Sequence, residues 1–273
     1  MLRVGAWPPA MRKPFVLWFI KRKKLVSFPF ATMLHGYYYE GNAANLIDYH
    51  ILSRGSFEPG LTQLLSRVAS HFDNALLLDV GANVGVHSLG LCRNFRQVIA
   101  VEPNPVVYER LKRTIACNGI KNIDLQPYAL GSSEGEVMFK LPSSRNLGTG
   151  RVVDDVDEKN VVSVPLTAGD TLVSKHSNTL VAVKIDVEGL EISVLEGLKH
   201  SLDAFRPFIA IEVLSANESY AQQLIATLPN GYDFYMIEKI NKRTVQLREG
   251  FMDGDLLACP TEKQNILKSV IVR

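Results

Sequence analysis

The sequence predicts an α/β protein with a doubly wound, mostly parallel sheet. The first observation is a regular alternation after residue 70, where short apolar segments alternate with helical patterns of about ten to fifteen residues. The second is that the apolar segments are hydrophobic on both faces, as expected for strands of a sheet covered by helices on both sides. The third is the ordinary globular composition, with 47% hydrophobic and 21% charged residues in a chain of 273.

The predicted elements divide the chain into a leader, residues 1–70, and a main domain, residues 71–273. The leader shows helical patterns near 44–53 and 58–70. In the main domain, apolar runs predict strands at 76–80, 97–102, 122–131, 135–141, 180–189, 207–213 and 232–240. Helices are expected near 84–94, 105–117, 190–199 and 217–227, and a loop rich in Ser, Gly, Asn and Asp is expected over 142–160.

Charge and cysteine content narrow the function classes. The formal net charge of +2 gives no global field that would attract nucleic acid or an acidic partner. The three cysteines, Cys92, Cys117 and Cys259, are an odd number without metal-ligand spacing, which indicates a reducing, cytoplasmic location. Cys92 and Cys117 fall in helical patterns, where small core residues are expected.

The start of the chain has a composition of its own. The first thirty residues carry seven basic side chains and no acid, and "PFVLWFIKRKK" places an apolar run beside a basic cluster. This run is too short to span a bilayer, which takes about twenty apolar residues. Weak peripheral contact with a membrane through residues 12–24 is one expectation. Packing of the apolar residues on the domain or on a partner subunit is the other.

The turn after the first strand of the main domain predicts a cofactor site. In "LLLDVGANVG", Asp79 ends the strand, Gly81 and Gly85 leave room for a ligand at the backbone, and Asn83 lies between them. The dinucleotide fingerprint G-x-G-x-x-G lacks its second glycine here. Glu102 ends the next strand, where a carboxylate accepts hydrogen bonds from ribose hydroxyls or caps the following helix.

Ionisable side chains at the end of the fourth main strand predict the catalytic centre. With a period of two, Lys184, Asp186 and Glu188 share one face at the carboxyl end of a buried strand, where open α/β sheets bind ligands. A structural ion pair is the alternative. Asp186 and Glu188 are the candidate bases, and Lys184 would orient them or hold substrate oxygens. With Glu212 these acids resemble a cation site, but the ammonium of Lys184 repels a metal ion, so we expect none.

Five segments together resemble one enzyme family. "LLLDVGANVGVHSL", "VIAVEPNP", "PYALGSSEGEV", "VAVKIDVEGLEISVLEG" and "PFIAIEV" resemble, in order and spacing, the FkbM family of S-adenosylmethionine-dependent methyltransferases, over roughly residues 55 to 215. "YYYEG" and "DYHILSRGSFEPGL" resemble the leader that often precedes this domain. The resemblance implies a Rossmann-like seven-stranded sheet, an S-adenosyl-L-methionine site that includes Ala129, and methylation of a hydroxyl of a sugar, glycan or secondary metabolite. In such a site the carboxylate of Asp79 would suit the amino group of the cofactor, through ordered water. His87 departs from the family pattern, so the resemblance implies no role for it.

Three alternatives to methylation of a small hydroxylated acceptor are disfavoured by the sequence. A nicotinamide-dependent oxidoreductase is disfavoured by the missing glycine and by the absence of a Tyr-x-x-x-Lys pair after the fourth strand. A cofactor-binding or glycan-binding protein without turnover is disfavoured by the intact Asp186 and Glu188. Nucleic-acid methylation is disfavoured because the fourth strand lacks the sequences that hold a flipped base. The sequence does not indicate an oligomeric state.

Overall fold

The computed structural model describes residues 2–3, 29–142, 150–153, 159–213, 218–238, 243–246 and 254–271. The segment 12–24, for which membrane contact was expected, lies outside the described residues, and so does most of the loop expected over 142–160. Within the described ranges no helix is both long and apolar enough to cross a membrane.

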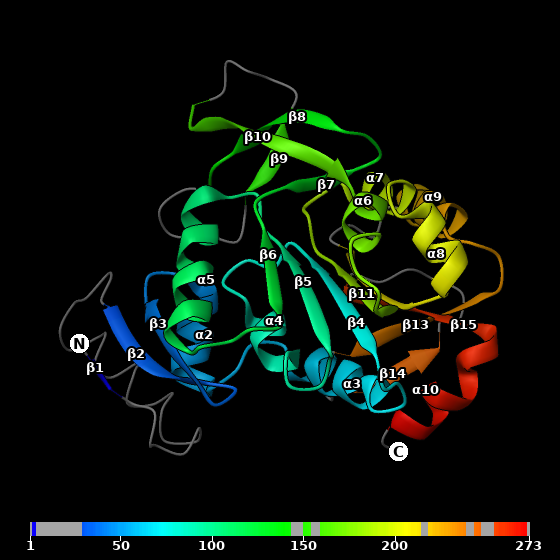
Figure 1. Ribbon diagram of the computed structural model, residues 1–273, viewed down its shortest axis with the longest axis horizontal. Helices are drawn as coiled ribbons and strands as arrows, with labels where there is room; N and C mark the ends of the chain where they lie inside the picture. Colours follow the sequence, from blue (N-terminus) through cyan, green and yellow to red (C-terminus); the bar gives the residue numbers. More distant parts are fainter. Residues whose placement is uncertain are drawn as a thin grey trace.

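The largest sheet runs in the order β14-β13-β15-β12-β11-β4-β5-β6 (Figure 1). Its strands are β4 (Ala75–Val80), β5 (Gln97–Val101), β6 (Ile123–Gln126), β11 (Thr179–Ile185), β12 (Phe208–Val213), β13 (Tyr232–Glu238), β14 (Arg243–Gln246) and β15 (Gly254–Pro260). Neighbouring strands from β6 to β12 are parallel, whereas β15 is antiparallel to both β12 and β13, and β14 is antiparallel to β13.

The predicted seven-stranded, mostly parallel sheet is confirmed in part. Strand β13 runs in the same direction as the strands from β6 to β12, because β12 and β13 are both antiparallel to β15. The sheet is mixed, and the described residues place eight strands in it. The difference arises because β15, which the sequence pattern did not reveal, returns between β12 and β13 and runs against both of them. Seven strands remain when the short edge strand β14 is set aside.

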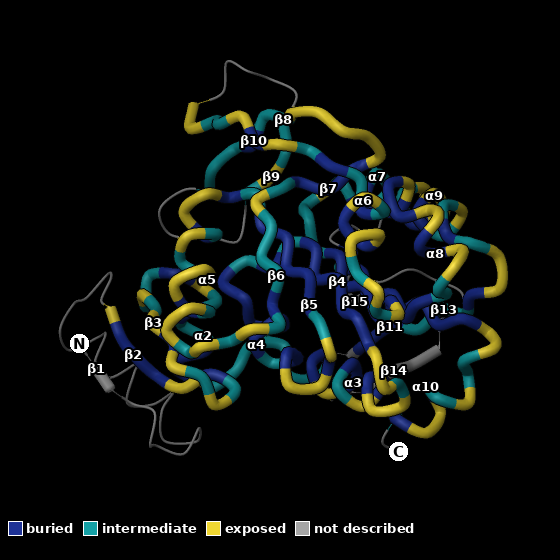
Figure 2. Tube along the Cα trace, viewed as in Figure 1, coloured by how far each residue is buried: buried dark blue, intermediate teal, exposed yellow. Residues whose placement is uncertain are grey.

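Helices cover both faces of the large sheet. The helices α3 (Pro59–Ala69), α4 (Val86–Leu91), α5 (Pro105–Cys117) and α10 (Gln264–Val270) share one hydrophobic core with Leu77 of β4. The helices α6 (Gly169–Val173), α7 (Glu191–Glu196), α8 (Lys199–Phe205) and α9 (Glu218–Thr227) share the other core with Leu76 and Leu78. The central strands are buried along most of their length (Figure 2). The doubly wound architecture is therefore confirmed.

A second sheet lies beside the large one, at the top of the view in Figure 1. It has the order β7-β10-β8-β9, with β7 (Ala129–Gly131), β8 (Gly135–Lys140), β9 (Arg151–Val153) and β10 (Val161–Ala168). The segment 122–131, expected to be one strand with a turn, is thus divided between β6 in the large sheet and β7 in the small one. This division brings β7 and β8 over the carboxyl ends of β4 and β5, where they help to line the candidate site.

The leader packs directly on the main domain. It contains the short sheet β1 (Leu2–Arg3), β2 (Pro29–Leu34) and β3 (Tyr37–Asn42), followed by α2 (Leu46–Arg54) and α3. Arg110 of α5 donates hydrogen bonds to Asp48 Oδ2 (2.9 Å) and to Tyr39 Oη (2.7 Å), and Asp48 is fully buried. Phe30 and Ile51 belong to the same core as Leu77. The leader and the main domain therefore share one hydrophobic core.

Candidate active site

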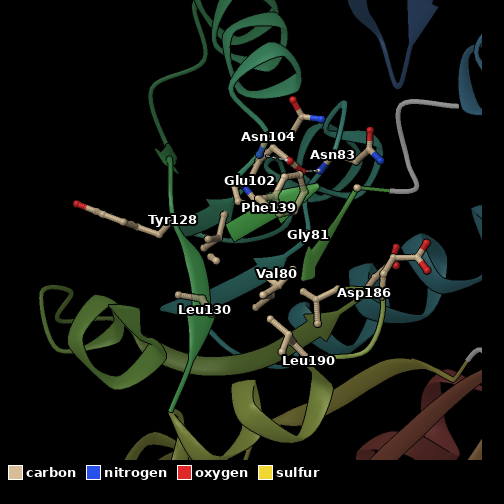
Figure 3. Close-up of a pocket in the computed structure, with 17 residues that line it drawn as sticks. Val80, Gly81, Asn83, Glu102, Asn104, Tyr128, Leu130, Phe139, Asp186 and Leu190 are labelled. Atoms are coloured by element: carbon tan, nitrogen blue, oxygen red, sulfur yellow. Dashed lines mark hydrogen bonds between the residues drawn. The ribbon is translucent and has the colours of Figure 1, made fainter. Parts of the chain in front are cut away.

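A pocket opens at the carboxyl ends of β4, β5 and β11 and is covered by the small sheet (Figure 3). It contains about 600 Å³ of atom-free space, part of it open to solvent. Polar groups line one part of it, namely those of Asn83, Glu102, Asn104, Asp186 and Glu188. Apolar side chains line the rest, among them Val80, Tyr128, Leu130, Phe139 and Leu190. We call this space the cofactor pocket, since apolar walls with a few polar groups are typical of cofactor sites.

The two glycines of the turn after β4 are required by the protein's own packing. Gly81 has φ +75°, and a Cβ there would lie 1.9 Å from the backbone oxygen of Asp186. Gly85 has φ +82°, and its Cβ would lie 2.3 Å from Leu111 Cδ1. The sequence interpretation, that both glycines leave room for a ligand at the backbone, is therefore corrected for Gly85, which does not line the pocket. Gly81 lines the cofactor pocket, but the space beside its Cα is filled by the segment after β11, and the space beside Gly85 is filled by α5.

Glu102 faces the cofactor pocket with a fixed carboxylate (Figure 3). Its Oε2 accepts a hydrogen bond from the amide of Asn83 and its Oε1 accepts one from the amide of Asn104, both at 2.8 Å. The cap of α5 is formed by Asn104, whose Oδ1 accepts from the amide of Val106. Because a carboxylate has about four acceptor positions, two remain for ligand hydroxyls. Burial raises the pKa of Glu102 to about 7, although the two amide hydrogen bonds oppose this shift.

Lys184 lies at the centre of a buried ion network. Its Nζ donates to the carbonyl oxygen of Gly81 (3.0 Å) and to Asp186 Oδ2 (3.2 Å), and it lies 3.6 Å from Asp79 Oδ1. Asp79 is fully buried, and its Oδ2 accepts from Ser88 Oγ at 2.6 Å. Burial by itself lowers the pKa of Lys184, but the charges of Asp186 and Asp79 outweigh this effect, so the pKa lies above its ordinary value.

The structural ion pair weighed from the sequence is thus present, and it joins the turn after β4 to the end of β11. Asp79, for which an interaction with the amino group of the cofactor was expected, does not line the cofactor pocket and instead balances the charge of Lys184.

The predicted row of Lys184, Asp186 and Glu188 is only partly correct. Strand β11 ends at Ile185, and Glu188 has φ +57°, so the alternation of faces stops before Glu188. Asp186 and Glu188 line the cofactor pocket, whereas Lys184 does not. Burial raises the pKa of Glu188, and the nearby charges of Asp186 and Glu191 raise it further. The two candidate bases therefore differ, since Asp186 is paired with an ammonium and Glu188 is held beside other carboxylates.

A second, smaller cavity adjoins the first through Asp186. It contains about 210 Å³ of atom-free space, part of it open to solvent, and is lined by Glu58, Leu61, Lys184, Ile185, Asp186, Ala210 and Glu212. We call it the acceptor cavity. Glu212, which was expected to face the same cleft as the other acids, lines this cavity and not the cofactor pocket. Among the residues that the structure describes, no group of three or more His, Cys, Asp or Glu side chains is arranged to hold a metal ion.

Comparison with known proteins identifies the family. Residues 79–239 match the methyltransferase FkbM domain, which is more than half of the chain. This protein belongs to the FkbM methyltransferase family. The recognition made from the motifs is confirmed, and with it S-adenosyl-L-methionine as the cofactor of the family. The family therefore takes the place of the alternative interpretation as a nicotinamide-dependent oxidoreductase.

Individual relatives of this FkbM protein are distant. It is 31% identical to hexuronic acid methyltransferase AglP of Haloferax volcanii, over 57% of this chain and 62% of that protein. It is 27% identical to methyltransferase sdnD of Sordaria araneosa, over 48% of this chain and 63% of that protein. The chain thus spans less than two thirds of the length of these relatives. A solved FkbM methyltransferase from Methylobacillus flagellatus is 18% identical, with a TM-score of 0.44 over 67% of this chain and 42% of that one.

Several residues of the FkbM site were not singled out from the sequence. Tyr128 and Phe139 line the cofactor pocket because β6 and β7 separate, which the apolar pattern of 122–131 does not show. Glu58 lines the acceptor cavity and comes from the leader. The only signal for it is its place in "DYHILSRGSFEPGL", the segment that resembles the family's leader. Ala129 does line the cofactor pocket, as the resemblance implied.

Proposed function

We propose that this protein is an S-adenosylmethionine-dependent O-methyltransferase that acts on a hydroxyl of a sugar, a glycan or a secondary metabolite. The observation that carries the proposal is the position of Asp186, which lines both the cofactor pocket and the acceptor cavity. A carboxylate shared by two adjoining cavities is placed to contact a hydroxyl from one side and the methyl donor from the other. AglP, by its name a methyltransferase of hexuronic acid, supports a sugar as the acceptor class.

The cofactor pocket has groups suited to each part of S-adenosylmethionine. The carboxylate of Glu102 would accept hydrogen bonds from the ribose hydroxyls. The apolar side chains of Tyr128, Leu130 and Phe139 would pack against the adenine. The turn at Gly81 would face the amino-acid end. When bound, the cofactor supplies an activated methyl group, so the protein's own task is to position the acceptor and to remove its proton.

The proton has a defined destination in this proposal. Conversion of a hydroxyl into a methyl ether releases one proton, and an alkyl hydroxyl is too weak an acid to lose it unaided. We assign its removal to Asp186, whose Oδ2 is held by Lys184 at 3.2 Å. The hydrogen-bonded ion pair with Lys184 fixes the orientation of this carboxylate. Glu188 is the second candidate, because its raised pKa makes it the stronger base when ionised.

The test is transfer of a labelled methyl group from S-adenosylmethionine to hydroxylated compounds. The full-length protein is incubated with a panel of methyl glycosides and hydroxylated natural products, and methylated products are detected by mass spectrometry. The proposal predicts an ether product that forms with wild-type protein and not with Asp186→Asn. A protein that binds S-adenosylhomocysteine but methylates nothing in a broad screen would instead support the alternative of binding without turnover.

A further inference from the structure

Glu58 has an unusual backbone conformation at the border between leader and main domain. It precedes Pro59 at the start of α3 and has φ 43° and ψ 53°, the left-handed region that side chains other than glycine rarely adopt. Its side chain does not cap the helix that it precedes. Such conformations are strained and cluster at functional sites. Asn83 and Glu188, which line the cofactor pocket, also have positive φ.

The carboxylate of Glu58 is held by a buried histidine. Oε2 of Glu58 lies 3.4 Å from Nε2 of His87, and Nδ1 of His87 lies 3.1 Å from the hydroxyl of Thr62. The side chain of His87 is 7% exposed and that of Glu58 is 17% exposed. A carboxylate only accepts hydrogen bonds, so Nε2 must donate to it, and Nδ1 of a neutral ring then accepts from Thr62. Thr62 and His87 thus fix the orientation of Glu58.

Glu58 points toward the proposed catalytic centre. It lines the acceptor cavity together with Lys184, Asp186 and Glu212. Its negative charge is close enough to add to the effects of Asp186 and Asp79 in raising the pKa of Lys184. Three carboxylates from three different elements therefore surround one small space. Carboxylates accept hydrogen bonds, and hydroxyl groups are neutral donors that such a site can bind.

We propose that the acceptor cavity receives hydroxyl groups of the methyl acceptor, that this acceptor is a polyhydroxylated compound such as a sugar, and that Glu58 binds a hydroxyl next to the one that is methylated. His87 is a positioning residue that acts through Glu58. This inference rests on the proposed function. It makes the leader a part of the active site, because the acceptor would be bound between α3 and the carboxyl ends of β11 and β12.

Glu58→Gln tests the inference, because it preserves the size of the side chain and removes its charge. In full-length protein we expect the KM for a methyl glycoside acceptor to rise about 10- to 100-fold, the range for a lost hydrogen bond to a charged group. The affinity for S-adenosylhomocysteine, measured by calorimetry, should stay within about twofold, because Glu58 does not line the cofactor pocket. Asp124→Asn is the matched control, since it breaks another histidine–carboxylate pair, with His176 at 3.2 Å, outside both cavities.

A second pair of variants separates positioning from stability. Gln at position 87 retains a donor near the place of Nε2, whereas Leu does not. His87→Gln should keep the KM within about threefold of wild type, and His87→Leu should raise it as Glu58→Gln does. A residue with a merely structural role would lower the free energy of unfolding and leave the KM unchanged in both variants.

Binding without turnover is followed by saturation-transfer NMR. The probes are the methyl glycosides of glucose, galactose and glucuronic acid, added to full-length protein that is saturated with S-adenosylhomocysteine. We expect signals from at least one glycoside with wild type and Asp124→Asn, and their loss with Glu58→Gln. An unchanged signal and KM in Glu58→Gln, with methyl transfer intact, would overturn the inference and leave the proposed function standing. Absence of methyl transfer by wild type would overturn the proposed function itself.

Discussion

The Cα of Gly81 lies against the backbone carbonyl of Asp186, so closely that a Cβ at position 81 would be 1.9 Å from that oxygen. The contact joins the turn after β4 to the segment after β11. Lys184 strengthens the same junction, since its Nζ binds the carbonyl of Gly81 and the carboxylate of Asp186. The cofactor turn and the proposed base are therefore one packed unit, and a change in either should disturb both.

Gly81→Ala should lower the free energy of unfolding by more than an alanine substitution at a glycine that has only a positive φ. Gly119 also has a positive φ, +63°, but its Cβ would meet nothing within 4 Å, which makes Gly119→Ala the matched control. The control should lower the free energy of unfolding by about 1–2 kcal/mol, the cost of the left-handed region. Gly81→Ala should add about 1–3 kcal/mol for the clash. Urea denaturation measures both, and equal losses would mean that the turn relaxes without disturbing Asp186.

Removal of the Lys184 charge should leave a buried carboxylate without its counter-ion. Lys184→Met is expected to lower the free energy of unfolding by about 3–5 kcal/mol, because Asp79 is fully buried and would lose its partner. The double variant Lys184→Met with Asp79→Asn should recover part of this loss, since no uncompensated charge would remain at position 79. Lys112→Met, which breaks an exposed pair with Glu109, should cost less than about 1 kcal/mol. A double variant no better than the single one would contradict the pairing.

The affinity for the nucleoside part of the cofactor should depend on pH through Glu102. Because the pKa of Glu102 is raised to about 7, its carboxyl group is largely protonated below pH 7 when the pocket is empty. Ribose hydroxyls require the ionised form, so binding must displace the proton. The Kd should rise about tenfold for each pH unit below 7 and become constant above it. The probe is 5′-methylthioadenosine, which carries the ribose but no amino-acid group that titrates near neutrality. Glu102→Ala should weaken binding by about 1–3 kcal/mol and abolish the pH dependence.

Asp186→Asn should separate catalysis from binding. The substitution keeps the shape of the side chain, so the affinity for S-adenosylhomocysteine should change little. The turnover number should fall by about 10² to 10⁴, the range for a missing general base. If Asp186→Asn remains active while Glu188→Gln is inactive, Glu188 is the base. If a chelator abolishes activity and magnesium restores it, a metal ion takes the place of the base in this mechanism.

The sequence predicted the elements that are set by local pattern. Strands β4, β5 and β12 are apolar on both faces, and α5 begins at a proline, so each was located within about one residue. The start of β11 was located equally well, but its predicted end lay four residues too far along the chain. Strand β15 and the division of the expected helix 190–199 into α7 and α8 were missed. The division has a tertiary cause, because a Cβ at Gly197 would lie 1.9 Å from the carbonyl oxygen of Gly131. Such a close approach cannot be read from a pattern of hydrophobic residues.

The sequence predicted those site residues that come directly after a buried strand. Glu102 and Asp186 come directly after buried parallel strands, whose carboxyl ends meet at one edge of the sheet. Asp79 and Lys184 also occupy strand ends, but the sequence could not show that they pair with each other and stay out of the pocket. Glu58 was missed because only the packing of α3 on the sheet brings it to the cavity.

The basic segment at the start of the chain predicts weak binding to anionic membranes. Lys21, Arg22, Lys23 and Lys24 follow the apolar run 14–20, and each basic residue near an anionic surface contributes about 1 kcal/mol, screened by salt. Full-length protein should therefore sediment with phosphatidylserine vesicles at low salt and be released as salt is added. Deletion of residues 1–28 would also remove β1, which pairs with β2, so the test replaces the four basic residues with glutamine.

The control replaces four exposed lysines spread over the main domain, which changes the net charge equally; these are Lys112, Lys121, Lys175 and Lys199. Membrane binding through the basic segment predicts that only the first variant stays in the supernatant. If both variants sediment less than wild type to the same degree, the attraction comes from the net charge of the protein. If wild type itself does not sediment at low salt, the apolar run is a packing element.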